Sequence, residues 1–281
     1  MKKIIIVMLV ALSNLAVAQQ SVYVVQSDDN ILNTISVSSG NILSALTLQL
    51  ADTSPVFGLD VEVHPISGLI YIVGSTSSES ISDRFLGIVN LNTGIVTNVG
   101  SMGDAVASFT FTSDGTLYAV TGDGANDSEE LYTVNVTDGS MTFVMALGNG
   151  ADGEGIVYNP NDGLLYHSSQ DTIETIDPVS LTITAVTSGS DIAEITGMGY
   201  NSSDPNGGLF VIDRSEDLYT VSPLGVVTLI FDDIPGESGE FRGLTLAPPP
   251  AAIPSVSIYG LLILVFGMLM MLMVRRKSNH I

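Results

Sequence analysis

SFTFTSDGTLYAVTGDGANDSEELYTVNVTDGSMTFV, residues 108–144, contains four short runs in which apolar and polar residues alternate. Alternation with a period of two predicts β-strands, and the Asp, Asn, Gly and Ser residues that close each run favour turns. The stretch is therefore predicted to form one four-stranded antiparallel sheet.

Related segments precede and follow this stretch, so the chain is a repeat array. An aromatic residue in the second run of each unit recurs at spacings of 48, 47, 48 and 44 residues, at Tyr23, Tyr71, Tyr118, Tyr166 and Phe210. A period of this length is typical of solenoids and propellers, whose units cannot bury their faces alone. The regular position of the aromatic residues favours packing between units over stacking on sugars.

The two ends of the array complement each other. The first unit begins at SVYVV (21–25) with no first run before it, and the segment GLTLAPPP (243–250) is a first run with no second run after it. In a circular array the last strand completes the first sheet, which removes exposed edges. The sequence therefore predicts an all-β fold, a five-bladed β-propeller closed by its C-terminal strand. An irregular β-sandwich and a six-bladed ring with a degenerate unit are the alternatives.

The N-terminus has the features of an export signal. Residues 1–18 contain Lys2 and Lys3, an apolar run, and small residues at Ala16 and Ala18. This pattern predicts a secretory signal peptide cleaved after Ala18, with an uncleaved anchor as the alternative. The propeller domain is then expected at 19–247.

The C-terminal region changes composition twice. Residues 248–252 are a Pro/Ala segment, which is predicted to be a stiff, extended spacer. The nineteen residues from 256 to 274 carry no charge, which is long enough for a transmembrane helix. The basic residues that follow are expected to stay cytoplasmic, so the propeller is predicted to lie outside the membrane.

Residues 253–281 resemble the IPTL-CTERM protein-sorting domain of Gram-negative bacteria, a relative in layout of the PEP-CTERM signals. That family begins with Ile-Pro-Thr-Leu-Ser-Glu-Trp-Gly, followed by an apolar helix and a basic cluster. The matching positions are Ile253, Pro254, Ser257 and Gly260, with Tyr259 at the aromatic position and Arg275, Arg276 and Lys277 in the cluster. Ser255, Val256 and Ile258 depart from the pattern.

The resemblance implies an exosortase-like sorting enzyme as a partner. It also implies inner-membrane anchoring with a periplasmic ectodomain, or processing to the cell surface or extracellular space. A plain single-pass anchor is the alternative. The repeats themselves resemble bacterial secreted propellers with Gly-x-Leu-Tyr units, which implies a fold and no particular activity.

Charge in the mature domain is one-sided. Residues 19–252 contain all thirty acidic residues, three arginines and no lysine, which gives a net charge of −27. This excludes unaided binding to nucleic acid or to anionic lipid, which both need positive charge. It favours solubility, cation binding or a basic partner. The absence of cysteine excludes disulfides, thiolate metal sites and a cysteine nucleophile.

Most acidic residues fall in the loops between units and between second and third runs, so one rim of the ring is predicted to be acidic. The loop DGANDSEE (123–130) supplies the candidate Ca²⁺ ligands Asp123, Asn126, Asp127 and Glu129. A solvated hairpin loop is the alternative, because no loop has the spacing of an EF-hand.

The sequence contains no recognisable catalytic motif for a serine hydrolase, a zinc protease or a nucleotide-binding enzyme. His64 and His167 occupy different places in the repeat, which favours structural roles over a metal pair. We therefore expect a binding module at the cell surface or in extracellular matrix, with an unidentified surface protein or glycan as its partner. The alternative is a hydrolase or lyase acting on extracellular polysaccharide through rim carboxylates.

Overall fold

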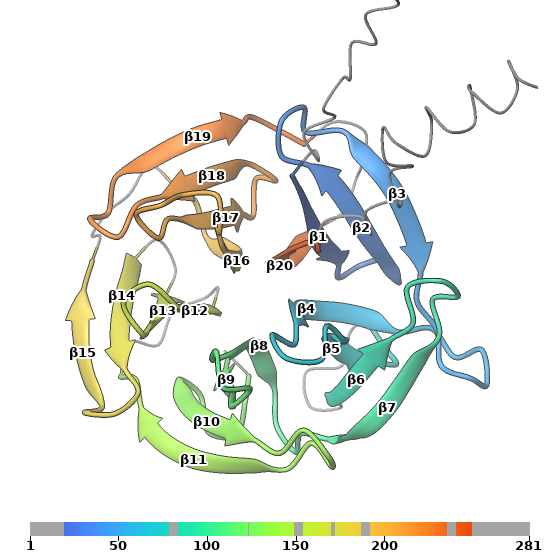
Figure 1. The fold of residues 1–281 in the computed structure, drawn as a ribbon. Helices are drawn as coiled ribbons and strands as arrows, with labels where there is room; N and C mark the ends of the chain where they lie inside the picture. The colour runs from blue at the N-terminus through green and yellow to red at the C-terminus, as the bar shows by residue number, and fades with distance from the viewer. Residues whose placement is uncertain are drawn as a thin grey trace, which may run out of the picture. The chain divides into compact units, whose positions relative to one another are not determined.

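The computed structural model describes residues 20–78, 84–122, 124–148, 154–169, 172–186, 192–234 and 240–248. These residues form five four-stranded antiparallel sheets arranged as blades around a ring (Figure 1). The prediction of a five-bladed β-propeller is confirmed, and the sandwich and the six-bladed ring are excluded.

Each blade is built from consecutive strands, except the first, which takes its inner strand from the far end of the chain. Blade 1 contains, from the centre outward, β20 (Phe241–Leu246), β1 (Ser21–Gln26), β2 (Ile31–Ser36) and β3 (Ile42–Thr47). Blade 2 contains β4 (Phe57–Val63), β5 (Ile70–Ser75), β6 (Phe85–Val89) and β7 (Val96–Ser101). Blade 3 contains β8 (Val106–Phe111), β9 (Leu117–Thr121), β10 (Glu130–Val134) and β11 (Met141–Ala146).

The last two blades follow the same order. Blade 4 contains β12 (Glu154–Asn159), β13 (Leu164–Ser169), β14 (Thr172–Asp177) and β15 (Thr182–Ala185). Blade 5 contains β16 (Ile195–Tyr200), β17 (Leu209–Asp213), β18 (Leu218–Val221) and β19 (Val227–Phe231). The described residues include no helix long and apolar enough to cross a membrane. The predicted signal peptide (1–18) and transmembrane segment (256–274) lie outside these residues.

The ring closes through the pairing of β20 with β1, as the orphan strand in the sequence predicts. Val22 lies opposite Leu246 and Val24 lies opposite Leu244. The backbone amide of Ala247 donates to the carbonyl of Ser21 at 2.9 Å, at the end of the pairing. All five sheets and their cores are therefore complete within residues 20–248, which can fold as one unit.

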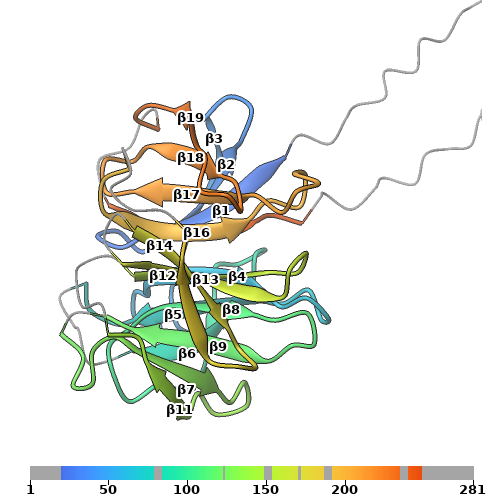
Figure 2. The same ribbon diagram turned by 90° about the vertical axis from the view of Figure 1, so that its left-hand side faces the viewer.

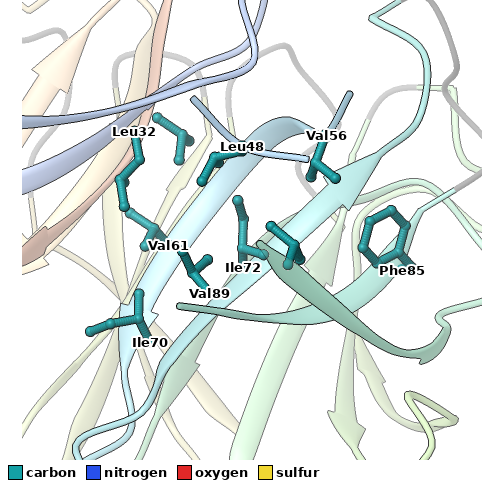
Figure 3. Packing of buried hydrophobic residues seen from close by; sticks show 10 residues of the cluster. Leu32, Leu48, Val56, Val61, Ile70, Ile72, Phe85 and Val89 are labelled. Atoms are coloured by element: carbon teal, nitrogen blue, oxygen red, sulfur yellow. The ribbon is translucent and has the colours of Figure 1, made fainter. Parts of the chain in front are cut away.

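Apolar clusters between neighbouring blades form the core. Figure 3 shows the cluster between blades 1 and 2, where Leu32 of β2 meets Val61 of β4 and Ile72 of β5. The outer strands β3 and β15 are mostly exposed.

The repeated aromatic residues only partly fulfil the prediction that they pack in the core. Tyr71, Tyr166 and Phe210 are buried, with 6%, 2% and 1% of their surface exposed. Tyr23 and Tyr118 are half-buried and line surface grooves. Both still pack against core clusters, Tyr23 between blades 1 and 2 and Tyr118 between blades 3 and 4, so the prediction holds for them in part.

The five inner strands pack closely around the centre, and glycine makes this possible. Gly243 of β20 has a φ of +54°, and a Cβ at this position would lie 2.3 Å from the Cα of Asp60 in β4. Gly197 of β16 packs against the backbone of Gly243 from the other side. Any side chain at Gly243 would collide with the backbone of β4.

We expect Gly243→Ala to destabilise the domain more than Gly103→Ala, measured by urea unfolding of residues 20–248. Both glycines have a positive φ, but a Cβ at Gly103 meets no atom within 4 Å. Gly103→Ala should cost about 1 kcal/mol from backbone strain alone. Gly243→Ala should cost a further 1–3 kcal/mol, roughly, from overpacking. Equal losses would show that the close approach at Gly243 is unimportant.

Candidate functional site

The two ends of the ring differ in their connections (Figure 2). The end that carries the connections between blades and the loops between second and third strands is called the loop face. We call turn face the opposite end, with the short turns between first and second and between third and fourth strands. All three arginines of the described residues, Arg84, Arg214 and Arg242, lie in strand ends or loops of the loop face.

A pocket of about 170 Å³ lies on the loop face between blades 1 and 2. We call it the arginine pocket, because two of those three arginines line it. Its lining residues are Ser27, Asp28, Phe57, Leu59, Ser75, Ser77, Ser78, Arg84, Glu240 and Arg242. No sequence motif marks Arg84 or Arg242; the signal that could have found them is their rarity as cations in a lysine-free domain.

The two arginines are held in different ways. Arg84 is buried, and its Nη1 donates to the carbonyl of Val106 in blade 3. Nη2 of Arg242 donates to Oε1 of Glu240 at 2.9 Å, while its Nε is buried without a hydrogen-bond partner. Guanidinium groups fixed in this way, beside several serine hydroxyls, suit a carboxylate or another planar anion.

The size of the arginine pocket limits what it can hold. Its volume is close to that of a cavity that holds one benzene ring, about 150 Å³, and well below the roughly 300 Å³ typical of small-molecule sites. The pocket therefore suits one protruding side chain or a single ring, and not a whole cofactor.

Two carboxyl groups lie in the inner ring, on β4. Oδ2 of Asp60 accepts hydrogen bonds from Oγ of Ser108 at 2.5 Å and from the amide of Phe109 at 2.8 Å. Oδ1 of Asp60 accepts from the amide of Val61 at 2.7 Å. Oγ of Ser108 in turn accepts from the amide of Ile156 at 3.0 Å. This network links the inner strands of blades 2, 3 and 4.

Burial controls the protonation of this pair. It raises the pKa of Asp60 to about 7, although Ser108 and two backbone amides favour the charged form. The pKa of Glu62 is raised well above its ordinary value by burial and then by repulsion from Asp60. Both groups therefore carry less negative charge near neutral pH than their number suggests.

The predicted calcium ligands are only partly described. Asp123 lies outside the described residues. The amides of Asn126 and Asp127 donate to the carboxylate of Asp104, at 2.8 and 3.2 Å, so Asp104 is the centre of this loop. Burial acts to raise the pKa of Asp104, but the amides of Asn126, Ala105 and Asp127 together lower it. The sequence could not show this link, because Asp104 and Asn126 are 22 residues apart.

Glu129 is the remaining predicted calcium ligand, and it has an unusual environment. Its side chain is buried, its φ is +59°, and neither carboxylate oxygen has a hydrogen-bond partner among the described residues. The described part of the chain contains no group of three His, Cys, Asp or Glu side chains that could hold a metal. The calcium site remains a prediction.

On the turn face the acidic residues shape the backbone. Asp114, Asp138 and Asp177 each accept a hydrogen bond from the amide two residues later. These bonds, together with nearby hydroxyls, lower the pKa of all three groups. Such turns are a standard use of aspartate, and the three carboxylates belong to three separate turns.

His64 and His167 belong to different blades, and each makes its own local contacts. Nδ1 of His64 accepts from the amides of Ile66 and Ser67 at 3.2 Å. His167 is buried and lies 3.1 Å from Glu174. These contacts agree with the structural roles expected from the sequence.

No protein-family model and no curated protein matches the chain. Solved structures match its fold. A chain from a crystal structure of a nidogen/laminin complex is 11% identical with a TM-score of 0.56, covering 83% of this chain and 100% of that one. A protein of unknown function from Bacteroides caccae is 12% identical with a TM-score of 0.52, covering 81% of this chain and 98% of that one. These similarities support the propeller fold alone.

The pKa of Asp60 predicts a pH dependence of stability. In the unfolded chain this group ionises near 3.8, whereas in the folded domain it stays protonated up to about pH 7. The contribution of Asp60 to the free energy of unfolding is therefore fully present below about pH 4 and is lost as the pH rises to about 7. The difference between the pKa of Asp60 in the folded domain and in the unfolded chain corresponds to about 4 kcal/mol of stability.

We expect the free energy of unfolding of residues 20–248 to fall between about pH 4 and 7, and Asp60→Asn to reduce this slope. Asp114→Asn is the control. The pKa of Asp114 is lowered in the folded domain, so the stability that its charged form contributes should be lost only at more acidic pH. An unchanged slope in Asp60→Asn would contradict the assignment.

Glu129→Gln tests the calcium prediction. If no cation binds, replacing this buried carboxyl group, which has no hydrogen-bond partner among the described residues, should leave the melting temperature unchanged or higher, with or without a chelator. If Ca²⁺ binds, the natural domain should melt at a higher temperature as free Ca²⁺ rises, and Glu129→Gln should lose that rise. A calcium effect that survives in Glu129→Gln would rule out Glu129 as a ligand.

Proposed function

We propose that this chain is an exported β-propeller that acts as a binding module and contacts its partner through the loop face. The predicted signal peptide and C-terminal sorting signal support export. The closed ring supports a rigid scaffold with variable loops, which is a common arrangement for binding sites. The similar chain from the nidogen/laminin complex was determined in a complex with another protein, which is compatible with this role.

The observation that carries the proposal is the arginine pocket within an acidic face. The loop face holds many carboxylates, among them Asp28, Asp29, Asp52, Asp127, Glu130, Glu216, Asp232 and Asp233. Such a surface attracts a basic partner over long range and speeds its association. Arg84 and Arg242 then provide a short-range contact of opposite sign, which suits one acidic group on that partner.

The partner that fits is therefore a mainly basic protein surface from which one acidic side chain protrudes into the arginine pocket. The small volume of the pocket agrees with a single side chain. Charge pairs in such an interface contribute more to specificity than to affinity, since both groups lose water on binding.

The alternative is a polysaccharide hydrolase or lyase that uses rim carboxylates. The raised pKa of Asp60 lies in the range of a general acid. However, Asp60 is 2% exposed and accepts three hydrogen bonds from its own chain. On the rim, Asp104 and Asp213 accept hydrogen bonds from backbone amides. This geometry favours binding over catalysis.

The place of action belongs to the same proposal. We infer that the propeller faces the periplasm, anchored in the inner membrane by residues 256–274, or is delivered to the cell surface after an exosortase-like enzyme processes the C-terminal signal. Protease treatment of intact spheroplasts tests this arrangement, and a fully protected propeller would refute it.

Binding to basic polypeptides tests the function. Residues 20–248 should bind polylysine and a lysine-rich copolymer of Lys and Glu, and both affinities should fall when salt exceeds about 0.1 M. Arg242→Gln should weaken binding of the copolymer about tenfold, because each hydrogen bond to a charged group is worth about 1.5–3 kcal/mol. It should not weaken binding of polylysine, which lacks the acidic group.

Arg214→Gln is the matched control for this experiment. Arg214 lies on the same face and pairs with Glu194 outside the arginine pocket, so the variant makes the same change of charge. If both variants weaken copolymer binding equally, the arginine pocket has no special role. If neither polymer binds at low salt, the loop face is not a contact surface for basic partners.

A further inference from the structure

A second and larger depression lies on the turn face, between blades 3 and 4. It has a volume of about 340 Å³, within the range of small-molecule sites. Its lining residues are Thr112, Ser113, Asp114, Thr116, Tyr118, Tyr158, Gly163, Pro178 and Val179. We call it the Tyr118 groove.

The Tyr118 groove has an apolar part and a polar part. Tyr118 and Tyr158 are half-buried, and Val179 is 91% exposed. The polar part is the turn after β8, where Oδ1 of Asp114 accepts from Oγ1 of Thr112 at 2.6 Å and from the amide of Thr116 at 3.0 Å. These bonds fix the carboxylate in place and favour its charged form.

The charge of the groove restricts its ligand. Asp114 is the single charged residue in the lining, which includes no arginine, lysine or histidine. An acidic ligand would therefore be repelled. A purely apolar ligand would cover Asp114 and the neighbouring hydroxyls without replacing their hydrogen bonds to water, which is costly.

The hydroxyl groups of the tyrosines in the grooves are available for contact with a ligand. The phenols of Tyr132, Tyr166, Tyr200 and Tyr219 donate to Asp, Glu or Asn side chains within the ring. The phenols of Tyr23, Tyr118 and Tyr158, which line grooves, make no such hydrogen bond among the described residues, and neither does that of the buried Tyr71. The three groove tyrosines are half-buried, so water or a ligand can reach their hydroxyls.

A smaller groove lies between blades 1 and 2. It has a volume of about 190 Å³ and is lined by Tyr23, Leu32, Thr34, Ser44, Ala45, Leu46 and Leu91. Tyr23 is the repeat counterpart of Tyr118. At the junction of blades 2 and 3 the counterpart is Tyr71, whose ring packs against Phe111 at 5.2 Å. The groove is therefore open at some junctions and filled by side chains at others.

We propose that the Tyr118 groove binds a neutral sugar ring of a glycan, and that the Tyr23 groove is a weaker second site. A sugar ring has an apolar face of C–H groups and an edge of hydroxyls. The face matches Tyr118 and Tyr158, and the hydroxyls match Asp114 and Thr116. The site lies on the opposite face from the arginine pocket, so the two contacts can form together.

Tyrosine fluorescence provides a direct test, because the chain contains no tryptophan. Residues 20–248 are titrated with maltohexaose and cellohexaose, neutral hexasaccharides with α and β linkages. At least one should give a saturable change, with a Kd on the order of 1 mM, as expected for a shallow site. Tyr118→Leu should weaken binding at least tenfold, and Tyr118→Phe, which keeps the ring, should weaken it less. Tyr23→Leu should remove a weaker second phase.

Phe143→Leu is the matched control, since Phe143 is an exposed aromatic residue on β11 outside both grooves. Circular dichroism of each variant checks that the ring is folded. Unchanged sugar affinity in folded Tyr118→Leu would overturn the proposal, as would the absence of binding with both sugars. Saturable binding of hexaproline in place of the sugars would make the groove a peptide site and would also overturn it. Arg242→Gln should bind sugar normally, so this test is independent of the loop face.

Discussion

The pairing of β20 with β1 is the interaction on which the rest of the structure depends. Each blade buries its faces against two neighbours, and the interface between blades 5 and 1 includes Phe241 and Leu244 of the closing strand. Without β20, that interface would lose much of its apolar surface and β1 would present an open edge. The same strand brings Arg242 and Glu240 to the loop face, so the arginine pocket exists only when the ring is closed.

The architecture follows from the sequence because it depends on a period. Aromatic residues at nearly constant spacing, and a first run left over at residue 243, specify five blades and their closure. Contacts between loops do not follow, since they join residues that the period does not relate. The hydrogen bonds from Asn126 and Asp127 to Asp104 are an example, and they determine which acidic residue the loop surrounds.

The environments of the repeated tyrosines also do not follow from the repeat period. Tyr118 and Tyr166 occupy equivalent positions, yet the phenol of Tyr166 donates to Asp162 at 2.8 Å, whereas Tyr118 has no such partner. Tyr71 is instead covered by the aromatic ring of Phe111. A position in the repeat predicts where a side chain lies, while its neighbours in the adjacent blade decide whether it belongs to the core or to a surface groove. The acidic residues likewise have different roles. Some form turns, and some accept hydrogen bonds from backbone amides across loops. Burial partly neutralises Asp60 and Glu62.

The closing pair of strands also has a mechanical consequence. The last residues of β20 lie beside the first residues of β1, where Leu246 faces Val22. A force applied to the chain beyond residue 248 acts on the free end of this pairing, so it would separate the strands one hydrogen bond at a time, as in peeling, without loading all bonds together. The strand that completes the ring is then also the first to yield under tension, which makes the closure a point where pulling can open the domain.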